Sequence, residues 1–564
     1  MKTTVGEVLA AFLEQCGVQA AFGVISIHNM PLLDAFHRRG RIRFIPARSE
    51  AGATNMADAY ARVMPGLGVS VTSTGTAAGN ACGAMVEALT GGTPLLHLSG
   101  QIEIPYLDRH QAYIHEARDQ LAMLAAVSKA AFRVWSAESA LPTLKLAVRT
   151  ALTAPTGPVS VEIPIDIQAS EIEWPADLSP LPVAPLVPPA AALDELADRL
   201  AQARRPLLWL GGGARAASAA VRRLVALGMG VVTSTQGRGI LPEDHPMTLG
   251  AYTLYPPVEE FYRRCDAMLV VGSRLRGNET LKYKLALPRP LYRIDADPQQ
   301  AQRSYPVDSF VAGDARLALD GLADRLQGRM RCDPAFARDL AAARDAAEAV
   351  VRKGIGPYAA LVDQLQQIAG RDFVWVRDVT VSNSTWGNRL LRIFGPCDGV
   401  HALGGGIGQG MQMGIGAAVA EQLRQQQLKP RAAPEAAHGR KVLCLTGDGG
   451  LQVNIGELAT AVQENADMIM VLMNDRGYGV IRNIQDAQYG GRRCYVDLHT
   501  PDFALLARSI ALPHCRVTDL GALPAALAAA DAARGPSLIE IDMIAIGPFA
   551  SAFAGPPVRE KEPA

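Results

Sequence analysis

The segment Gly447–Gly450 reads Gly-Asp-Gly-Gly and follows a short apolar run, Lys441–Thr446. A second apolar run, Met470–Met473, leads into Asn474–Gly479, which reads Asn-Asp-Arg-Gly-Tyr-Gly. Short apolar runs that end in glycine and Asx residues are typical of strands buried in a parallel sheet. The pattern therefore predicts an α/β fold in which both polar turns lie at the carboxyl edge of one sheet.

Oxygen ligands follow both of these expected strands. Asp448 can offer a carboxylate oxygen, and Asp475 and the main-chain carbonyl of Gly477 can offer two more. Hard oxygens at neighbouring strand ends suit Mg²⁺, which keeps water and takes its other ligands from phosphate groups. The sequence therefore predicts a Mg²⁺ site made by these three residues.

Glycines surround the first aspartate. Gly449 and Gly450 lack a Cβ atom, so a diphosphate can approach their backbone and accept from their N–H groups, and Gly447 completes the cradle. We expect the helix that follows to begin near Ile455. Gly-Asp-Gly turns are common in α/β proteins, so this turn alone does not identify a site.

The spacing of the two turns resembles the thiamine diphosphate fingerprint, in which GDG is followed by about two dozen residues and then Asn-Asn. Here 24 residues, 450 to 473, separate Gly449 from Asn474. The chain has Asn-Asp where the family usually has Asn-Asn. The aspartate keeps an oxygen ligand and adds a negative charge.

A glutamate far upstream supports the resemblance. The segments Ile45–Ala53 and Met56–Arg62 are similar to the R-x-E-x-x-A … A-x-x-Y-A-R pattern of the acetolactate synthase, benzoylformate decarboxylase and benzaldehyde lyase families. In those families the glutamate hydrogen-bonds the aminopyrimidine ring and promotes the imino tautomer that deprotonates the thiazolium carbon. The resemblance gives this role to Glu50. The alternative is a carboxylate facing a helix N-terminus.

Further segments resemble the same families. Val71–Met85 matches the turn over the coenzyme, which places Gly75 there, and Gly404–Gly408 matches the decarboxylase G-G-L-G segment. Ile407 then falls where those enzymes place the side chain that props the bent coenzyme, and a β-branched residue is stiff enough for this task. Ordinary core packing is the alternative for this isoleucine. The other expected coenzyme or pocket contacts are Gly408, Gln409 and Tyr478.

Two histidines are the candidates for moving protons. His28 lines up with a histidine of benzaldehyde lyase and of many synthase-like decarboxylases, and His115 lies where related enzymes have a coenzyme-facing glutamine. A loop or surface histidine satisfied by a neighbour is the alternative for each. Ser73 replaces the histidine of benzoylformate decarboxylase, and no His-His pair like that of pyruvate decarboxylase occurs. Neither of those proton relays is therefore expected intact.

Composition limits the class of protein. The 564 residues carry 55 basic and 55 acidic side chains, so no charge excess favours nucleic acid or an anionic membrane. Eight scattered cysteines without a Cys-x-x-Cys pair indicate reduced thiols, and the acidic amphipathic start is unlike a signal peptide. No apolar run is long enough to span a membrane. We expect a cytoplasmic protein.

The chain is too long for one core and predicts three doubly wound α/β domains with mostly parallel sheets. We place a pyrimidine-binding domain at 1–172, a central domain at 190–330 and a diphosphate-binding domain at 355–548. The similar segments Thr156–Ile163 and Arg534–Ile541 indicate a duplicated unit. The resemblance implies a coenzyme between two subunits, hence a homodimer as the minimum and an expected homotetramer.

The central domain raises the question of a nucleotide. A strand expected at Pro206–Leu210 runs into Gly211–Gly213, and acetolactate synthases bind FAD in this domain. No G-x-G-x-x-G is present, and three glycines often form only a tight turn. We expect no FAD.

The resemblance implies a 2-oxo acid decarboxylase or carboligase that uses thiamine diphosphate and Mg²⁺ and forms an enamine on the coenzyme. An acyloin (2-hydroxy ketone) lyase is an alternative, favoured by His28. An inactive coenzyme-binding subunit is a third reading, which intact Glu50, Asp448 and Asp475 disfavour. The sequence does not indicate the side chain of the substrate. It also does not indicate whether the enamine is protonated or is ligated to a second carbonyl.

Overall fold

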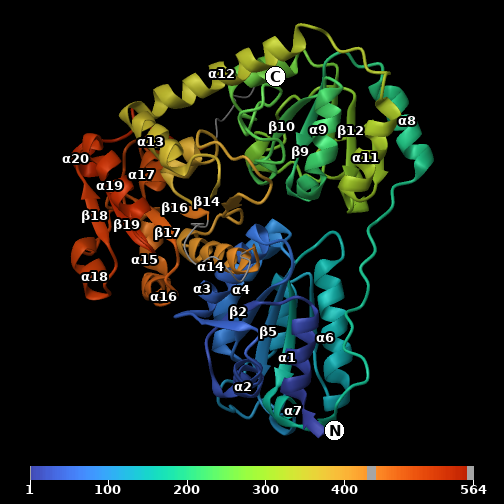
Figure 1. Cartoon of the computed structure of the whole chain (residues 1–564). Helices are drawn as coiled ribbons and strands as arrows, with labels where there is room; N and C mark the ends of the chain where they lie inside the picture. The colour runs from blue at the N-terminus through green and yellow to red at the C-terminus, as the bar shows by residue number, and fades with distance from the viewer. Residues whose placement is uncertain (1, 429–439, 556–564) are drawn as a thin grey trace.

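The computed structural model describes residues 2–428 and 440–555. Three parallel sheets follow one another along the chain, and each is covered by helices on both faces (Figure 1). The first domain lies below the other two in Figure 1, and the third domain lies beside the middle one. The predicted fold class, three doubly wound α/β domains, is confirmed.

The first and third sheets have the same strand order. Each has six strands, and in each the strands, counted along the chain, are arranged 2-1-3-4-6-5. The similar segments noted in the sequence fall on β7 and β19, which are the last strands of their sheets in chain order. This supports a duplicated unit. The first sheet comprises β2 (Ala20–Gly23), β3 (Arg43–Pro46), β4 (Gly68–Thr72), β5 (Leu95–Gln101), β6 (Ala130–Arg133) and β7 (Val159–Pro164). The third comprises β14 (Phe373–Arg377), β15 (Gly399–His401), β16 (Lys441–Gly447), β17 (Met468–Asn474), β18 (His514–Val517) and β19 (Ser537–Asp542).

The middle sheet has the order β10-β9-β11-β12-β13. The strand expected at Pro206–Leu210 is confirmed as β9. The glycines after it are required by packing, because a Cβ on Gly213 would lie 2.9 Å from the Cα of Gly272. The other strands are β10 (Gly230–Thr233), β11 (Ala267–Val271), β12 (Leu291–Asp295) and β13 (Ser309–Ala312), and a short pair, β1 (Lys2–Thr4) and β8 (Glu171–Glu173), lies at the base of the first domain.

Helices alternate with the strands in every domain. The first domain has α1 (Val5–Gln15), α2 (Met30–Arg39), α3 (Glu50–Val63), α4 (Thr76–Gly91), α5 (Gln120–Val127), α6 (Ala137–Leu152) and α7 (Ile165–Ala169). The middle domain has α8 (Ala190–Leu200), α9 (Ser218–Ala226), α10 (Pro256–Tyr262) and α11 (Ala315–Leu326), and α12 (Phe336–Ile355) leads out of it. The third has α13 (Ala359–Ala369), α14 (Gly410–Leu428), α15 (Asp448–Val453), α16 (Glu457–Gln463), α17 (Gly479–Gln488), α18 (Phe503–Ser509), α19 (Leu523–Ala532) and α20 (Met543–Ile546).

A short helix that the sequence did not predict, α15, begins within the Gly-Asp-Gly segment. It starts at Asp448 itself, and a turn at residues 454–456 separates it from α16. The helix expected near Ile455 is α16, which begins at Glu457, whereas α15 was missed because both glycines after the aspartate adopt helical geometry and form part of its first turn. The aspartate therefore lies at a helix start directly at the end of β16.

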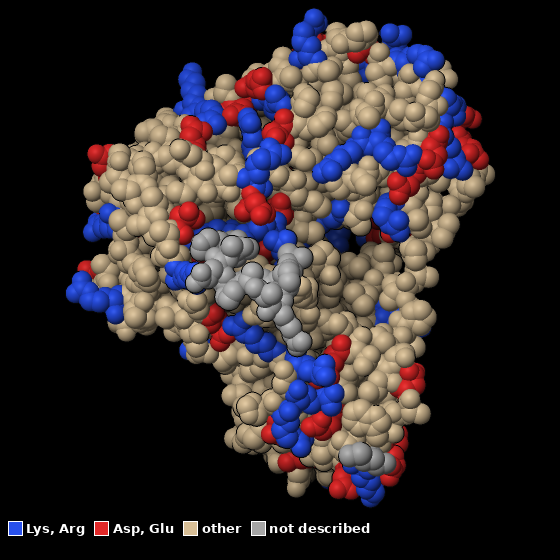
Figure 2. All heavy atoms as spheres, in the orientation of Figure 1, with Lys and Arg blue, Asp and Glu red and all other residues tan. Residues whose placement is uncertain are grey.

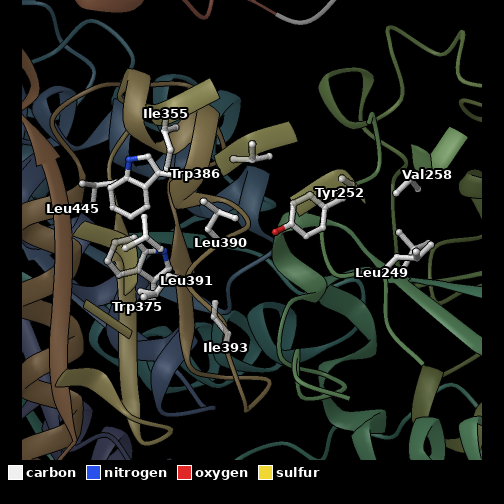
Figure 3. Packing of buried hydrophobic residues seen from close by; sticks show 14 of the residues in the cluster. Leu249, Tyr252, Val258, Ile355, Trp375, Trp386, Leu390, Leu391, Ile393 and Leu445 are labelled. Carbon is white, nitrogen blue, oxygen red and sulfur yellow. The ribbon is translucent and has the colours of Figure 1, made fainter. Parts of the chain in front are cut away.

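Buried apolar side chains join the domains. One cluster runs from the middle sheet to the third sheet, and Figure 3 shows Trp375 and Trp386 together with Leu390 in this region and Tyr252 beyond them. A second cluster joins α3 of the first domain to α14 and the third sheet. Within the described residues the domains thus share apolar cores.

The surface carries both signs of charge. Figure 2 shows Lys and Arg interspersed with Asp and Glu over the face in view. Every helix within the described ranges is too short or too polar to cross a lipid bilayer.

A buried ionic network connects the first domain to the third. Arg62 on α3 donates to Glu87 on α4 at 3.0 Å and pairs with Asp58 at 2.6 Å. It also donates to the carbonyl of His401 at 2.7 Å. Glu87 in turn accepts from the backbone N–H of Leu403 at 2.8 Å. The loop after β15 is therefore held by side chains of the first domain.

The network supports a stability prediction. Glu87→Gln should lower the free energy of unfolding by about 3 kcal/mol, because it leaves Arg62 with less countercharge in a buried site. Urea unfolding followed by tryptophan fluorescence measures this, since Trp375 and Trp386 are fully buried. The control is Glu171→Gln, whose partner Lys2 lies at 3.4 Å on the surface. Equal stability of the two variants would contradict a structural role for the network.

Candidate functional site

Two carboxylates meet at the carboxyl edge of the third sheet. Asp448 follows β16, Asp475 follows β17, and these strands are adjacent and parallel. Asp448 is 1% exposed, and its Oδ2 atom has no hydrogen-bond partner among the described residues. Burial and then the neighbouring Asp475 raise the pKa of Asp448 to about 7, and burial also raises the pKa of Asp475.

This pair fits a divalent cation. Two adjacent buried carboxylates repel each other, and an unpartnered oxygen remains costly until a cation or a proton neutralises it. No group of three or more His, Cys, Asp or Glu side chains suited to a metal occurs within residues 2–428 and 440–555. A cation here would therefore need ligands from the backbone, as the carbonyl of Gly477 could provide, and from phosphate oxygens.

The extra charge of Asp475 has a local partner. Arg482 on α17 lies 3.6 Å from Asp475 and also donates to Asp497 at 3.2 Å. The arginine offsets the negative charge that distinguishes Asn-Asp from Asn-Asn.

The glycines of the first turn are also required by protein contacts. A Cβ on Gly449 would lie 2.8 Å from the ring of Tyr478, and one on Gly450 would lie 2.6 Å from Asp378. Gly408 has a φ of 80°, and a Cβ there would lie 2.6 Å from that of Val453. The Gly-Asp-Gly turn, the 404–410 loop and the tyrosine thus pack closely, with the N–H groups of the first turn of α15 at their centre.

Asp378 organises this region, and the sequence analysis missed it. It is fully buried after β14, and it accepts from the N–H of Gly408 at 3.0 Å and of Gln409 at 3.3 Å. Burial raises the pKa of Asp378 to about 6, against backbone donors that lower it. The signal was available, since Asp378, like Asp448, is an acid that follows an apolar strand.

The 404–410 loop presents the expected isoleucine. Ile407 is 38% exposed, so the alternative of ordinary core packing does not apply within this chain. Gln409 is 8% exposed, and its Oε1 atom has no partner among the described residues. The loop therefore offers an open apolar side chain and a free acceptor next to the Asp378 anchor.

Glu50 is the first residue of α3, which Ser49 caps by accepting from the N–H of Gly52 at 3.0 Å. Its Oε2 atom accepts from Asn80 Nδ2 at 3.1 Å. The preceding residue is fixed to the third domain, because Ser49 N donates to Glu457 Oε1 at 2.8 Å. Glu50 therefore faces the N-terminus of its own helix, α3, as the alternative interpretation expects. It is also held near α16, and its other carboxylate oxygen takes no part in these contacts.

The two predicted histidines lie together although they are far apart in sequence. The rings of His28 and His115 meet edge to face with centroids 5.1 Å apart. His28 is 5% exposed, and its Nδ1 atom lies 3.4 Å from Ser73 Oγ. Burial and then His115 lower the pKa of His28, against a smaller opposite effect of Glu103. The imidazole of His28 is therefore neutral at pH 7.

His115 differs from His28 in its exposure to solvent. It is exposed and has a φ of 67°, and a Cβ on Gly75, which has a φ of 63°, would lie 2.2 Å from its carbonyl oxygen. The structure thus brings Gly75 to the histidine pair.

A buried glutamine was missed. Gln120, at the start of α5, is 1% exposed and accepts from Gly75 N at 2.6 Å and from Thr74 Oγ1 at 2.9 Å. His115 was predicted to lie at the position of a coenzyme-facing glutamine of related enzymes. In the structure Gln120, five residues after His115, holds the Gly75 turn. The spacing between the histidine and the glutamine could not be interpreted without the loop conformation.

The candidate residues form two groups on different domains. Glu50, Gly75 and the histidines belong to the first domain, and the aspartates and Ile407 belong to the third. A cavity of about 950 Å³ beside α2 is lined by residues that include Ile25, Met30 and Leu423, and none of the predicted site residues lines it. Apolar side chains near the histidines are open to solvent, namely Ile25, Ile27, Met30 and Ile114. That cavity is therefore not the predicted site.

Comparisons with known proteins cover all three domains. Models of the thiamine pyrophosphate enzyme match residues 3–123 (N-terminal TPP binding domain), 193–322 (central domain) and 380–541 (C-terminal TPP binding domain). A Pseudomonas aeruginosa protein named "Probable 2-ketoarginine decarboxylase" is 32% identical over 95% of this chain and 94% of its own length. An Escherichia coli acetolactate synthase large subunit (isozyme 3) is 27% identical over 89% and 87%, and an Escherichia coli glyoxylate carboligase is 27% identical over 84% and 80%.

The aspartate pair supports a metal prediction. Asp448→Ala should weaken Mg²⁺-dependent binding of thiamine diphosphate by more than roughly 100-fold, since even outer-shell changes at metal sites cost 10–100-fold. Calorimetric titration of the protein with the diphosphate, with and without Mg²⁺, measures this. Asp475→Asn is the control and should bind the diphosphate normally, because the amide still offers an oxygen ligand. Arg482 still has Asp497 as an acidic partner in this variant. Wild-type affinity in Asp448→Ala would show that the metal assignment is wrong.

Proposed function

Since the chain belongs to the thiamine pyrophosphate enzyme family and is a thiamine diphosphate-dependent enzyme acting on C–C bonds, we propose that it is a Mg²⁺-dependent 2-oxo acid decarboxylase or carboligase. The observation that carries the metal part is the buried, unpartnered Oδ2 of Asp448 beside Asp475. The relative named for 2-ketoarginine makes that 2-oxo acid the first substrate to test.

The third domain would hold the diphosphate. Asp448, Asp475 and the carbonyl of Gly477 would bind Mg²⁺, and the N–H groups of Gly449 and Gly450 would donate to phosphate oxygens. When bound, the coenzyme supplies an electron sink for cleavage of the bond next to a carbonyl carbon. The exposed side chain of Ile407 would support it.

The first domain would activate the coenzyme. Glu50 would accept a hydrogen bond from the aminopyrimidine ring, with Asn80 restraining the other carboxylate oxygen at 3.1 Å. Because a carboxylate accepts strongly where water is excluded, this contact favours the protonated ring. Ser49 and its contact with Glu457 keep the glutamate in place.

The histidine pair would handle protons at the substrate. Neutral His28 has Nδ1 directed at Ser73, so Nε2 is the nitrogen we assign to proton exchange. His115, which is exposed, would exchange that proton with solvent.

We propose that two chains share each site, so that Glu50 and Asp448 of one coenzyme come from different subunits. The open apolar side chains around the histidines support this, because a partner would cover them. A homodimer is the minimum, and we propose a homotetramer in the cytoplasm, with no FAD.

A second candidate is an acyloin lyase. The buried His28 favours it, since such a lyase must take a proton from a hydroxyl group. An inactive subunit is disfavoured because Asp448 keeps an unpartnered oxygen that a retired site would not need.

A substrate panel tests the function. With thiamine diphosphate and Mg²⁺, the protein should release CO₂ from 2-oxo acids with a turnover on the order of 10 per second for its preferred substrate. Parallel reactions with an added aldehyde, and with acyloins alone, measure ligation and lyase activity. Acyloin cleavage without CO₂ release from any 2-oxo acid would favour the second candidate.

The activation step has its own prediction. Glu50→Gln should leave coenzyme binding intact and slow exchange of the thiazolium proton by roughly 100-fold or more, because a neutral amide does not favour the protonated ring. Proton–deuterium exchange followed by NMR measures this without a known substrate. Unchanged exchange in the variant would refute the role of Glu50, and slow exchange already in the wild type would support the inactive-subunit reading.

A further inference from the structure

Glu103 is a carboxylate without a cationic partner. It lies just after β5, before a short helical turn at Ile104–Tyr106. Its Oε2 atom is buried and has no hydrogen-bond partner among the described residues, and Oε1 accepts only a long bond from Tyr113 Oη at 3.4 Å. None of the Lys, Arg or His side chains in the described ranges forms an ion pair with it.

Several glutamates buried in this chain pair with arginines. Glu162 meets Arg133 at 2.6 Å, Glu243 meets Arg238 at 2.7 Å, and Glu421 meets Arg440 at 2.6 Å. A buried carboxylate oxygen without such a partner is costly. The Glu103 side chain is only half-buried, but its Oε2 atom, like Oδ2 of Asp448, is a buried carboxylate oxygen without a partner among the described residues. At Asp448 we assign the missing partner to a bound cation.

Aromatic rings flank this carboxylate. Tyr106 and Tyr113 stack with their centroids 4.6 Å apart and their planes 13° apart. Tyr113 is also the residue that donates to Glu103. A carboxylate beside stacked rings is suited to a planar or bulky cation, which gains both an ion pair and cation–π contact.

The cluster adjoins the histidine pair. The chain just before Glu103 lies against His28, because a Cβ on Gly100 would lie 2.5 Å from the carbonyl oxygen of His28, and the ring of His28 contacts that of His115. A group bound at Glu103 would therefore lie in the same region as the residues to which we assign proton exchange.

We propose that Glu103, with Tyr106 and Tyr113, binds a cationic group at the far end of the substrate's side chain. This inference rests on the proposed function and deepens it, because it gives the substrate class as 2-oxo acids with a positively charged tail. A guanidinium fits best, since its planar fork can donate to the carboxylate while its face lies on a ring.

The test uses three 2-oxo acids of similar shape. The 5-guanidino-2-oxopentanoate carries a planar cation, 5-ureido-2-oxopentanoate is its neutral counterpart, and 6-trimethylammonio-2-oxohexanoate carries a cation without N–H donors. For the wild-type holoenzyme we expect kcat/KM to be on the order of 100-fold higher for the guanidino than for the ureido compound. The trimethylammonio compound separates charge from hydrogen bonding, and a value between the other two supports recognition of charge.

Glu103→Gln should abolish this preference while leaving turnover of the ureido compound within about threefold. Asp108→Asn is the matched control, because Asp108 is a carboxylate of the same loop that already pairs with Arg133 at 2.7 Å and is half exposed. It should keep the preference. Unchanged thermal unfolding and coenzyme binding in both variants exclude a folding defect.

Two results would overturn the proposal. One is equal kcat/KM for the guanidino and ureido compounds in the wild type. The other is an equal loss for both compounds in Glu103→Gln, which would mean that the carboxylate only positions His28. If no 2-oxo acid is turned over, the proposed function fails, and calorimetric binding of the guanidino and ureido compounds to the holoenzyme still decides the inference. Tighter guanidino binding that Glu103→Gln removes supports it, and equal binding refutes it.

Discussion

The loop of the third domain that carries Ile407 is held by an ionic contact supplied by the first domain. Arg62 and Glu87 are buried together and bind the backbone at His401 and Leu403, directly before the loop that carries Ile407. Breaking such a pair leaves an uncompensated charge in a low-dielectric interior. The position of the loop is therefore coupled to the packing of α3 and α4, and α3 begins with Glu50.

The acidic side chains discussed above differ in whether a cationic side chain pairs with them. Glu162, Glu243 and Glu421 form ion pairs with arginines, although Oε1 of Glu162 has no hydrogen-bond partner among the described residues. Within the described residues, Asp448 and Glu103 have no ion pair, and each retains a buried oxygen without a hydrogen-bond partner. Because burial of such oxygens is costly, they mark the places where we assign a metal ion and a cationic substrate group.

Periodicity and motif spacing predicted much of the fold. The strands at Lys441 and Pro206 were expected from short apolar runs, and the structure has them as β16 and β9. The short helix α15 was missed, because glycine is compatible with both a turn and a helix start, and Tyr478 and Asp378 pack around the two glycines only in the folded chain.

The sequence by itself determined the strand ends, the apolar runs and the residue types at the Gly-Asp-Gly turn, since these depend on local chemistry and spacing. It also indicated Glu50 and the histidines as candidates. Only the tertiary structure decided that His28 meets His115, that Gln120 holds the Gly75 turn, and that Glu103 lacks a countercharge. These relations join segments whose separation depends on loop conformation and domain packing, so no local pattern encodes them.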